Sequence, residues 1–170
     1  MFEQSSADIW GQTGAAFRAA LAQAGAAPQA VGGIGFDAIC SLVAVGVDGA
    51  PVSVAEDADP QRDIVMWMDH RAVAEAAAIN ATHDPALTYV GGEVSVEMEL
   101  RKILWPRRHF SGHHVAVWRY LDLADYMVRR ATGADVASIC TRLFSDAETP
   151  FPSMWWRRGL PPKFVVGNRA

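Results

Sequence analysis

The sequence predicts a single α/β domain in which a mixed sheet is flanked by helices. Apolar residues at helical spacing alternate with short β-rich stretches, and glycine or proline stands between the two kinds of segment. The chain of 170 residues is 51% hydrophobic and 20% charged, which suits one globular unit and argues against disorder. We therefore expect one folded unit with an apolar core.

The N-terminal part predicts a helix followed by two strands. Ser5 and Asp8 form a possible capping box, and apolar residues then recur at helical intervals until Gly25. Two β-rich stretches follow, at residues 31–36 and 41–47, and a turn signal stands after the second. The expected order is helix, strand, strand.

The rest of the chain predicts one more strand and three more helices. A polar run that predicts a surface loop precedes the strand, which is expected at 64–68. The helices are expected at 72–80, 95–105 and 123–131, with Pro106 ending the second of them. No internal repeat or low-complexity segment is found.

Composition excludes several classes of protein. The net charge is −4 and the basic residues are scattered, so the sequence offers no extended positive face for nucleic acid. The N-terminus is acidic and polar, and no apolar run reaches membrane-spanning length, so neither a signal peptide nor a membrane partner is expected. Cys40 and Cys140 form no CxxC pair and are expected to be thiols, which predicts a cytoplasmic location.

Three stretches of sequence carry a resemblance to a known family. Residues 33–41 read GIGFDAICS, and residues 67–72 read WMDHRA. The third stretch joins YVGG at 89–92 to SVEM at 95–98 and KILW at 102–105. In order and spacing these stretches are similar to those of the FGGY carbohydrate kinases, with the ribulokinase branch as the nearest pattern.

The resemblance implies a partial ribonuclease-H-like, actin-like ATPase domain over residues 1–140, without the first hairpin of the family, and a divergent tail over 141–170. It implies phosphate transfer from ATP, with Mg²⁺, to a ketopentose such as ribulose or to a related polyol. The family's phosphate loop and catalytic base have no counterpart in the sequence. We therefore expect the chain to be inactive alone and to bind neither ATP nor Mg²⁺ tightly, and we assign no catalytic residue.

Four residues are candidates for the sugar-binding site: Asp37, Cys40, Asp69 and Glu97. Short polar side chains select hydroxyl groups by the direction of their hydrogen bonds, and Asp37 and Asp69 are expected at neighbouring strand ends on one side of the sheet. Each has an ordinary alternative. The two aspartates could cap a turn and a helix, Glu97 could be a first-turn glutamate, Arg71 could pair with a carboxylate, and Cys40 could be a small buried residue beside the site.

Two other readings stay open. The first is a non-catalytic remnant or interaction module, which would use a companion kinase chain or self-association through exposed sheet edges. The second is a small metal-binding protein that uses His109, His113 and His114, although Ser111 and Gly112 make a shared helix face doubtful. We assign no metal site, and we expect the proline-rich end of the chain to pack poorly.

Overall fold

The computed structural model describes residues 1–110 and 117–136. Its elements follow in the order β1 (Glu3–Gln4), α1 (Ser6–Ala24), η1 (Pro28–Ala30), β2 (Leu42–Val45), β3 (Ile64–Val65), α2 (Val73–Asn80), η2 (Pro85–Val90), α3 (Glu99–His109), β4 (Arg119–Asp122) and α4 (Leu123–Thr132). The predictions for the 141–170 tail, Cys140, His113 and His114 lie outside the described residues.

The four described strands form one sheet in the order β1-β3-β2-β4, and every pairing between them is antiparallel. Leu42, the first residue of β2, lies opposite Val65, the last residue of β3, and opposite Asp122, the last residue of β4. The beginning of β2 therefore meets the ends of β3 and β4. We call this end of the sheet, where the three strand termini meet, the site end.

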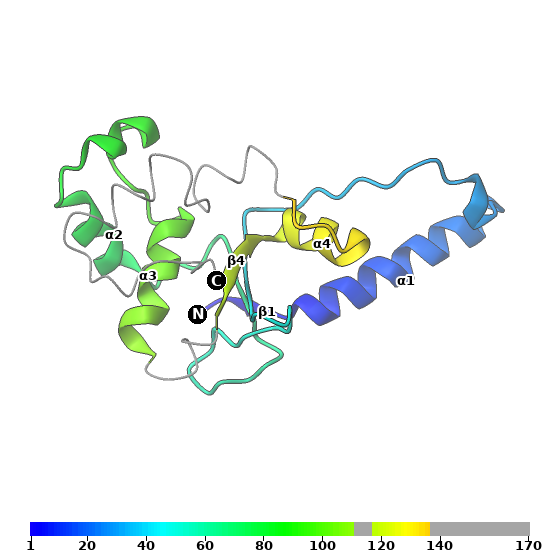
Figure 1. Cartoon of the computed structure of the whole chain (residues 1–170), viewed down its shortest axis with the longest axis horizontal. Helices are drawn as coiled ribbons and strands as arrows, with labels where there is room; N and C mark the ends of the chain where they lie inside the picture. Colours follow the sequence, from blue (N-terminus) through cyan, green and yellow to red (C-terminus); the bar gives the residue numbers. More distant parts are fainter. Residues whose placement is uncertain (111–116, 137–170) are drawn as a thin grey trace.

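Alternate side chains of the strands enter two apolar layers, because successive residues of a strand point to opposite faces. On one face, Val43, Ile64 and Leu121 pack with residues of α1 and α4. On the other face, Leu42 packs in a cluster with Ile103 of α3. A third cluster joins α2, η2 and α3. Figure 1 shows α1 and α4 on one side of the sheet strands and α2 and α3 on the other.

Helix α1 leaves the body of the molecule as an arm. Figure 1 shows it extending away from the sheet, with the chain that follows it returning alongside. The predicted cap is confirmed: Ser5 is the N-cap residue and its Oγ accepts a hydrogen bond from the Asp8 amide at 3.2 Å. The helix ends at Gly25, whose φ of 60° is the left-handed conformation that glycine adopts without strain.

Three boundaries differ from the sequence prediction. Residues 31–36 form no strand, because Gly32, Gly33 and Gly35 supply no side chains to pack and Ile34 is 60% exposed. Pro106 lies inside α3 instead of ending it, since residues 101–106 are buried and their packing outweighs the one backbone hydrogen bond that proline removes. Strand β4 was not among the predicted elements.

The other predicted elements are confirmed at shifted bounds. The strand expected at 41–47 is β2, and the strand expected at 64–68 is reduced to the two residues of β3. Helices α2 and α4 lie where the periodicity placed them. Helix α3 begins at Glu99, four residues later than expected, and Ser95 instead accepts a hydrogen bond from the Glu97 amide in the preceding turn. Among the described residues no helix has the length and apolar character needed to cross a bilayer.

Candidate functional site

The strand register brings polar residues from three separate parts of the chain to the site end. Cys40 and Ser41 stand directly before β2, the 66–71 segment follows β3, and Asp122 closes β4. The amide of Trp67 donates to Ser41 Oγ at 3.3 Å, which joins the first two of these parts directly. The site end is therefore a continuous surface built from distant residues.

Asp69 is the most heavily hydrogen-bonded residue of this surface. Its side chain is buried, and Oδ2 accepts from the Phe2 amide at 2.7 Å. Arg71 Nε lies 2.9 Å from both carboxylate oxygens, and the Arg71 amide donates to Oδ1 at 3.0 Å. Burial raises the pKa of Asp69, but the hydrogen bonds from Arg71 and Phe2 outweigh burial and lower the pKa to about 2. The carboxylate is thus ionised and fully engaged with the protein.

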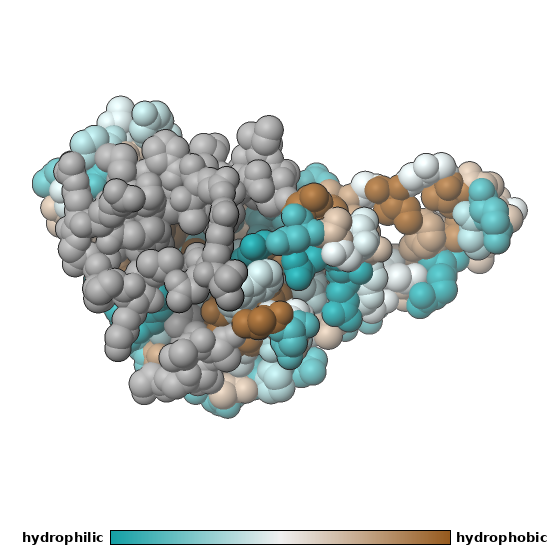
Figure 2. Space-filling view, in the orientation of Figure 1, coloured by the Kyte–Doolittle hydropathy of each residue, from teal (hydrophilic) through white to brown (hydrophobic). Residues whose placement is uncertain are grey.

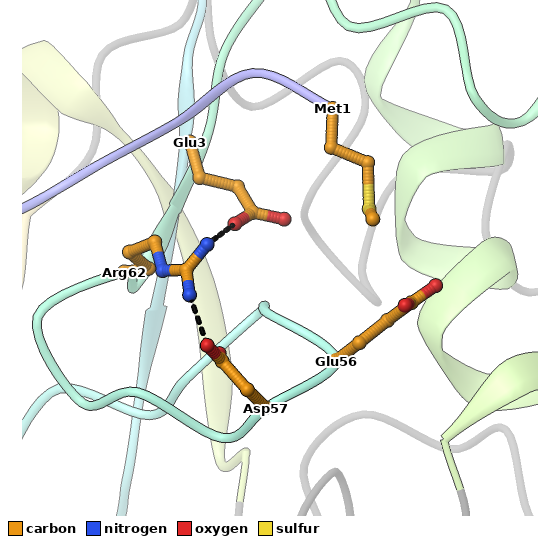
Figure 3. A pocket seen from close by; sticks show the side chains of 5 residues that line it. All are labelled: Met1, Glu3, Glu56, Asp57 and Arg62. Carbon is orange, nitrogen blue, oxygen red and sulfur yellow. Dashed lines mark hydrogen bonds and ion pairs between the residues drawn. The ribbon is translucent and has the colours of Figure 1, made fainter.

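An alternating row of charges continues from Asp69 across the edge of the sheet. Arg71 Nη2 lies 2.7 Å from Glu3 Oε1, and Glu3 Oε2 lies 3.4 Å from Arg62 Nη1. Arg62 in turn pairs with Asp57. Figure 3 shows Glu3, Arg62 and Asp57 beside an open pocket, which Met1 and Glu56 also line. The volume of the pocket is about 320 Å³. Through these ion pairs Glu3 and Arg62 connect β1 to the 56–63 loop and to the 66–71 segment.

A second group of charges lies where α3 meets β4. Glu99 forms a side-chain hydrogen bond with Asp122, and the Asp122 carboxylate also accepts from the Ala124 amide at 3.0 Å as the N-cap of α4. Burial and the nearby Asp122 charge raise the pKa of Glu99 to about 7. A proton shared between the two carboxylates follows from this arrangement, because like charges in contact cannot both ionise freely.

The four predicted site residues differ in exposure. Asp37 is exposed in the irregular segment that leads into β2, so the prediction that it follows a strand is wrong. Cys40 is exposed as well, so the alternative of a small buried residue is wrong. Glu97 is exposed and pairs with His70, Oε1 to Nε2 at 3.5 Å. Only Asp69 is buried.

The structure supports the ordinary alternative that was kept open for Arg71, since it is the main partner of Asp69. Cys40 is not arranged as a nucleophile. Partial burial, followed by the charges of Asp122 and Glu99, raises the pKa of its thiol, which disfavours the reactive thiolate.

Sequence reasoning missed three residues that build the site end: Glu99, Arg101 and Lys102. Arg101 and Lys102 are both buried, at 0% and 2% exposure. Lys102 was visible as part of the KILW stretch, but neighbouring charged residues on a helix are ordinarily expected in solvent. Only the position of α3 against the 66–71 segment reveals that these side chains turn inward.

The donors described here do not form a metal site. Among residues 1–110 and 117–136, no group of three His, Cys, Asp or Glu side chains is placed to hold an ion. His109 has its Nδ1 2.9 Å from the carbonyl oxygen of Trp105 and stacks on the Trp105 ring.

Comparison with curated proteins gives relatives of one kind. The chain is 38% identical over 149 residues to a D-ribulokinase of Saccharomyces cerevisiae, covering 86% of this chain and 21% of that protein. It is 34% identical over 176 residues to an FGGY carbohydrate kinase domain-containing protein of Homo sapiens, covering 98% and 30%. A ribulokinase of Mycolicibacterium smegmatis is 34% identical over 155 residues, covering 86% and 28%. The chain thus spans less than a third of each of these relatives. No protein-family model matches the chain.

Among solved structures, a xylulose kinase from Brucella ovis superposes with a TM-score of 0.70 at 19% identity, over 84% of this chain and 28% of that one. This likeness confirms the predicted fold class, a partial domain of the actin-like, ribonuclease-H-like kind found in sugar kinases. The relatives then give the family. The chain is related to the FGGY carbohydrate kinases, as its three motifs predicted, and the relationship covers part of their length.

Proposed function

We propose that residues 1–140 form the sugar-binding side of a kinase that phosphorylates a ketopentose such as ribulose, or a related polyol, with ATP and Mg²⁺ held outside the described residues. The observation that carries the proposal is the convergence of Cys40, the 66–71 segment and Glu97 at one edge of the sheet in a relative of ribulokinases. We propose a cytoplasmic location for the same protein. The tail at 141–170 is proposed to be divergent.

The four candidate residues have two different roles in this proposal. Asp37, Cys40 and Glu97 are exposed and supply polar atoms to the hydroxyl groups of the sugar. The Asp69 carboxylate, which is already occupied by Arg71 and the Phe2 amide, fixes the 66–71 segment and contributes to the site mainly through that position. Such a surface selects among sugars by the directions of its hydrogen bonds.

We expect the chain to bind D-ribulose weakly, with a dissociation constant of about 1 mM or higher, because an open surface leaves water competing for each hydrogen bond. Glu97→Gln should weaken binding about fivefold through loss of a charge-assisted hydrogen bond. A titration followed by amide NMR shifts measures both. Glu93→Gln is the matched control, because Glu93 is an exposed glutamate in the same turn region. Equal affinities for the two variants, or no saturable shift with the wild type, would contradict the proposal.

We expect no sugar-dependent release of ADP when this chain is mixed with ATP, Mg²⁺ and pentuloses. Phosphoryl transfer depends on holding the nucleotide, metal and hydroxyl group together, and this chain spans less than a third of the relatives that are named kinases. A coupled assay on material free of host kinases makes the measurement. ADP release that scales with the amount of chain and is weakened by Glu97→Gln would show a complete small kinase and would contradict this part of the proposal.

A second candidate function is an interaction module that completes its fold with a companion kinase chain or with a second copy. Its support is the arm, where Phe17, Ile34 and Ile39 are 37%, 60% and 58% exposed. Figure 2 shows apolar side chains gathered on this arm, at the end of the molecule away from the sheet. Sugar binding without turnover is compatible with this module as well as with the kinase part.

A further inference from the structure

Two consecutive cations of α3 are buried against the site end. Arg101 Nη2 donates to the carbonyl oxygen of Asp69 at 3.0 Å. Lys102 Nζ donates to the carbonyl oxygens of Met66 and Trp67 at 3.0 and 2.6 Å. We call Arg101 and Lys102 the cation pair. Its three hydrogen bonds all go to backbone atoms of one short stretch of the 66–71 segment.

These backbone carbonyls need partners because they follow the end of a strand. β3 stops at Val65, so the next carbonyls leave the sheet ladder while the chain is still packed against α3. Buried carbonyl groups without a donor are costly. The cation pair supplies donors to the Trp67 and Asp69 carbonyls, and it adds a second donor to the Met66 carbonyl, which also accepts from the Asp69 amide at 3.0 Å. The backbone of the 66–71 segment is therefore held by side chains together with two backbone hydrogen bonds, from the Met66 amide to the Phe2 carbonyl and from the Asp69 amide to the Met66 carbonyl.

Burying two cations to hold this segment carries a desolvation cost that apolar side chains would avoid. Burial, with the nearby Arg101 charge, lowers the pKa of Lys102 to about 8, and burial lowers the pKa of Arg101. Arg101 Nε and Nη1 also find no hydrogen-bond partner among the described residues. Replacing buried charges with apolar side chains of similar size is often neutral or stabilising. The cation pair therefore points to a requirement for a fixed position.

The candidate site has two halves, the 66–71 segment with His70 and the turn before α3 with Glu97, and their relative position is what must be fixed. His70 belongs to the 66–71 segment, and Glu97 lies just before α3, yet their side chains meet at 3.5 Å. The cation pair is the direct connection between the same two parts of the chain, one helical turn further on. A shift of α3 relative to the 66–71 segment would separate Glu97 from His70.

We infer that Arg101 and Lys102 are positioning residues of the sugar site: by holding the backbone of residues 66–69 against α3, they fix the distance between the His70 half and the Glu97 half of the surface. The inference rests on the proposed sugar-binding function. It concerns preorganisation, since a surface held in its bound geometry loses less free energy of ordering when a sugar binds.

The test uses Lys102→Met and Arg101→Met in the 170-residue chain, with Arg108→Met as the matched control. Arg108 is on the same helix and pairs with the Glu75 side chain, so its loss removes one positive charge without touching residues 66–69. Hydrogen exchange is followed at the amides of Trp67, Asp69 and Arg71, each of which donates a hydrogen bond in the structure. Lys102→Met should speed their exchange about tenfold and the control less than about twofold.

D-ribulose affinity is the second measurement on the same variants. Lys102→Met should weaken binding about fivefold, and Lys102→Arg, which keeps the donors, should recover at least half of the loss in logarithmic terms. Exchange and affinity equal to those of Arg108→Met would overturn the inference. If Lys102→Met does not fold, hydrogen exchange of the wild type is measured alone. Its three amides must be protected before sugar is added, and unprotected amides would overturn the inference.

The two failures are distinguishable. A wild-type chain that does not bind ribulose, but whose 66–71 amides are protected by the cation pair, contradicts the sugar-binding function and leaves the backbone contact intact. A wild-type chain that binds ribulose with the same affinity as Lys102→Met contradicts the positioning role and leaves the sugar-binding function intact.

Discussion

Asp69→Asn is expected to lower the free energy of unfolding by about 3 kcal/mol, because it leaves the Arg71 side chain, which is only 9% exposed, without its main counter-ion. The uncharged amide also accepts fewer of the hydrogen bonds that the Phe2 amide and Arg71 now donate. Urea unfolding at pH 7 with an unchanged denaturant slope measures the loss. The matched control is Asp59→Asn, whose half-exposed ion pair with Arg62 should be worth less than about 0.5 kcal/mol.

The acid dependence provides a separate check on the same residue. The folded pKa of Asp69 is about 2, below its ordinary value of 3.8, so the native state binds fewer protons than the unfolded state between these values. Its contribution to stability is therefore complete above pH 4 and is lost as the pH falls toward 2. Asp69→Asn should have a flatter stability profile over that range than the wild type. A loss no larger than that of Asp59→Asn, with an unchanged acid profile, would contradict this account.

Local sequence signals predicted the helices well because each signal and its effect lie within a few residues. The Ser5 hydroxyl and the Asp8 amide that it accepts from are three positions apart, so a pattern of four residues contains the whole interaction. The same holds for α4, which Asp122 caps and Gly133 ends in the left-handed conformation. Short-range chemistry decides these boundaries, and tertiary contacts only reinforce them.

The motifs also predicted that two distant stretches of the chain lie close together. Asp37 and Asp69 were expected at neighbouring strand ends; the pairing of Leu42 with Val65 brings the ends of their two stretches together, but no strand precedes Asp37. What the sequence could not supply was the role of each side chain. Asp69 is bound by Phe2 and lies close to Glu3 through Arg71, residues more than 60 positions away, and no local pattern encodes contacts over that separation.

The buried charges are the clearest limit of sequence reasoning in this protein. Charge normally predicts exposure, yet Arg101 and Lys102 are buried and Glu99 is partly buried. Their burial follows from the position of α3 over the 66–71 segment and β4, which is a property of the fold as a whole. Residues that contradict the local pattern in this way are often found at functional sites, and for this reason we chose the cation pair and Glu99 for mutation.

Glu99→Gln is expected to raise the free energy of unfolding by about 2 kcal/mol at pH 8 and to change it little at pH 4. The folded pKa of Glu99 is about 7, above its ordinary value of 4.5, because burial and the charge of Asp122 disfavour the ionised form. Between these two values the native state binds more protons than the unfolded state. Stability from this group is therefore complete below pH 4.5 and is lost as the pH rises toward 7. Glutamine keeps a donor toward Asp122 at every pH and removes this loss.

Thermal and urea unfolding of both proteins from pH 4 to pH 8 test the sign and the size of the effect. The difference between variant and wild type isolates Glu99 from other groups that titrate in the same range. The expected gain is below the limit of the full pKa shift, because replacing Glu99 also removes its attraction for the buried Lys102 ammonium. Glu93→Gln, an exposed glutamate, should show a difference of less than about 0.5 kcal/mol at every pH. If the Glu99→Gln difference is instead constant with pH, the proton shared between Glu99 and Asp122 is not a feature of the folded protein.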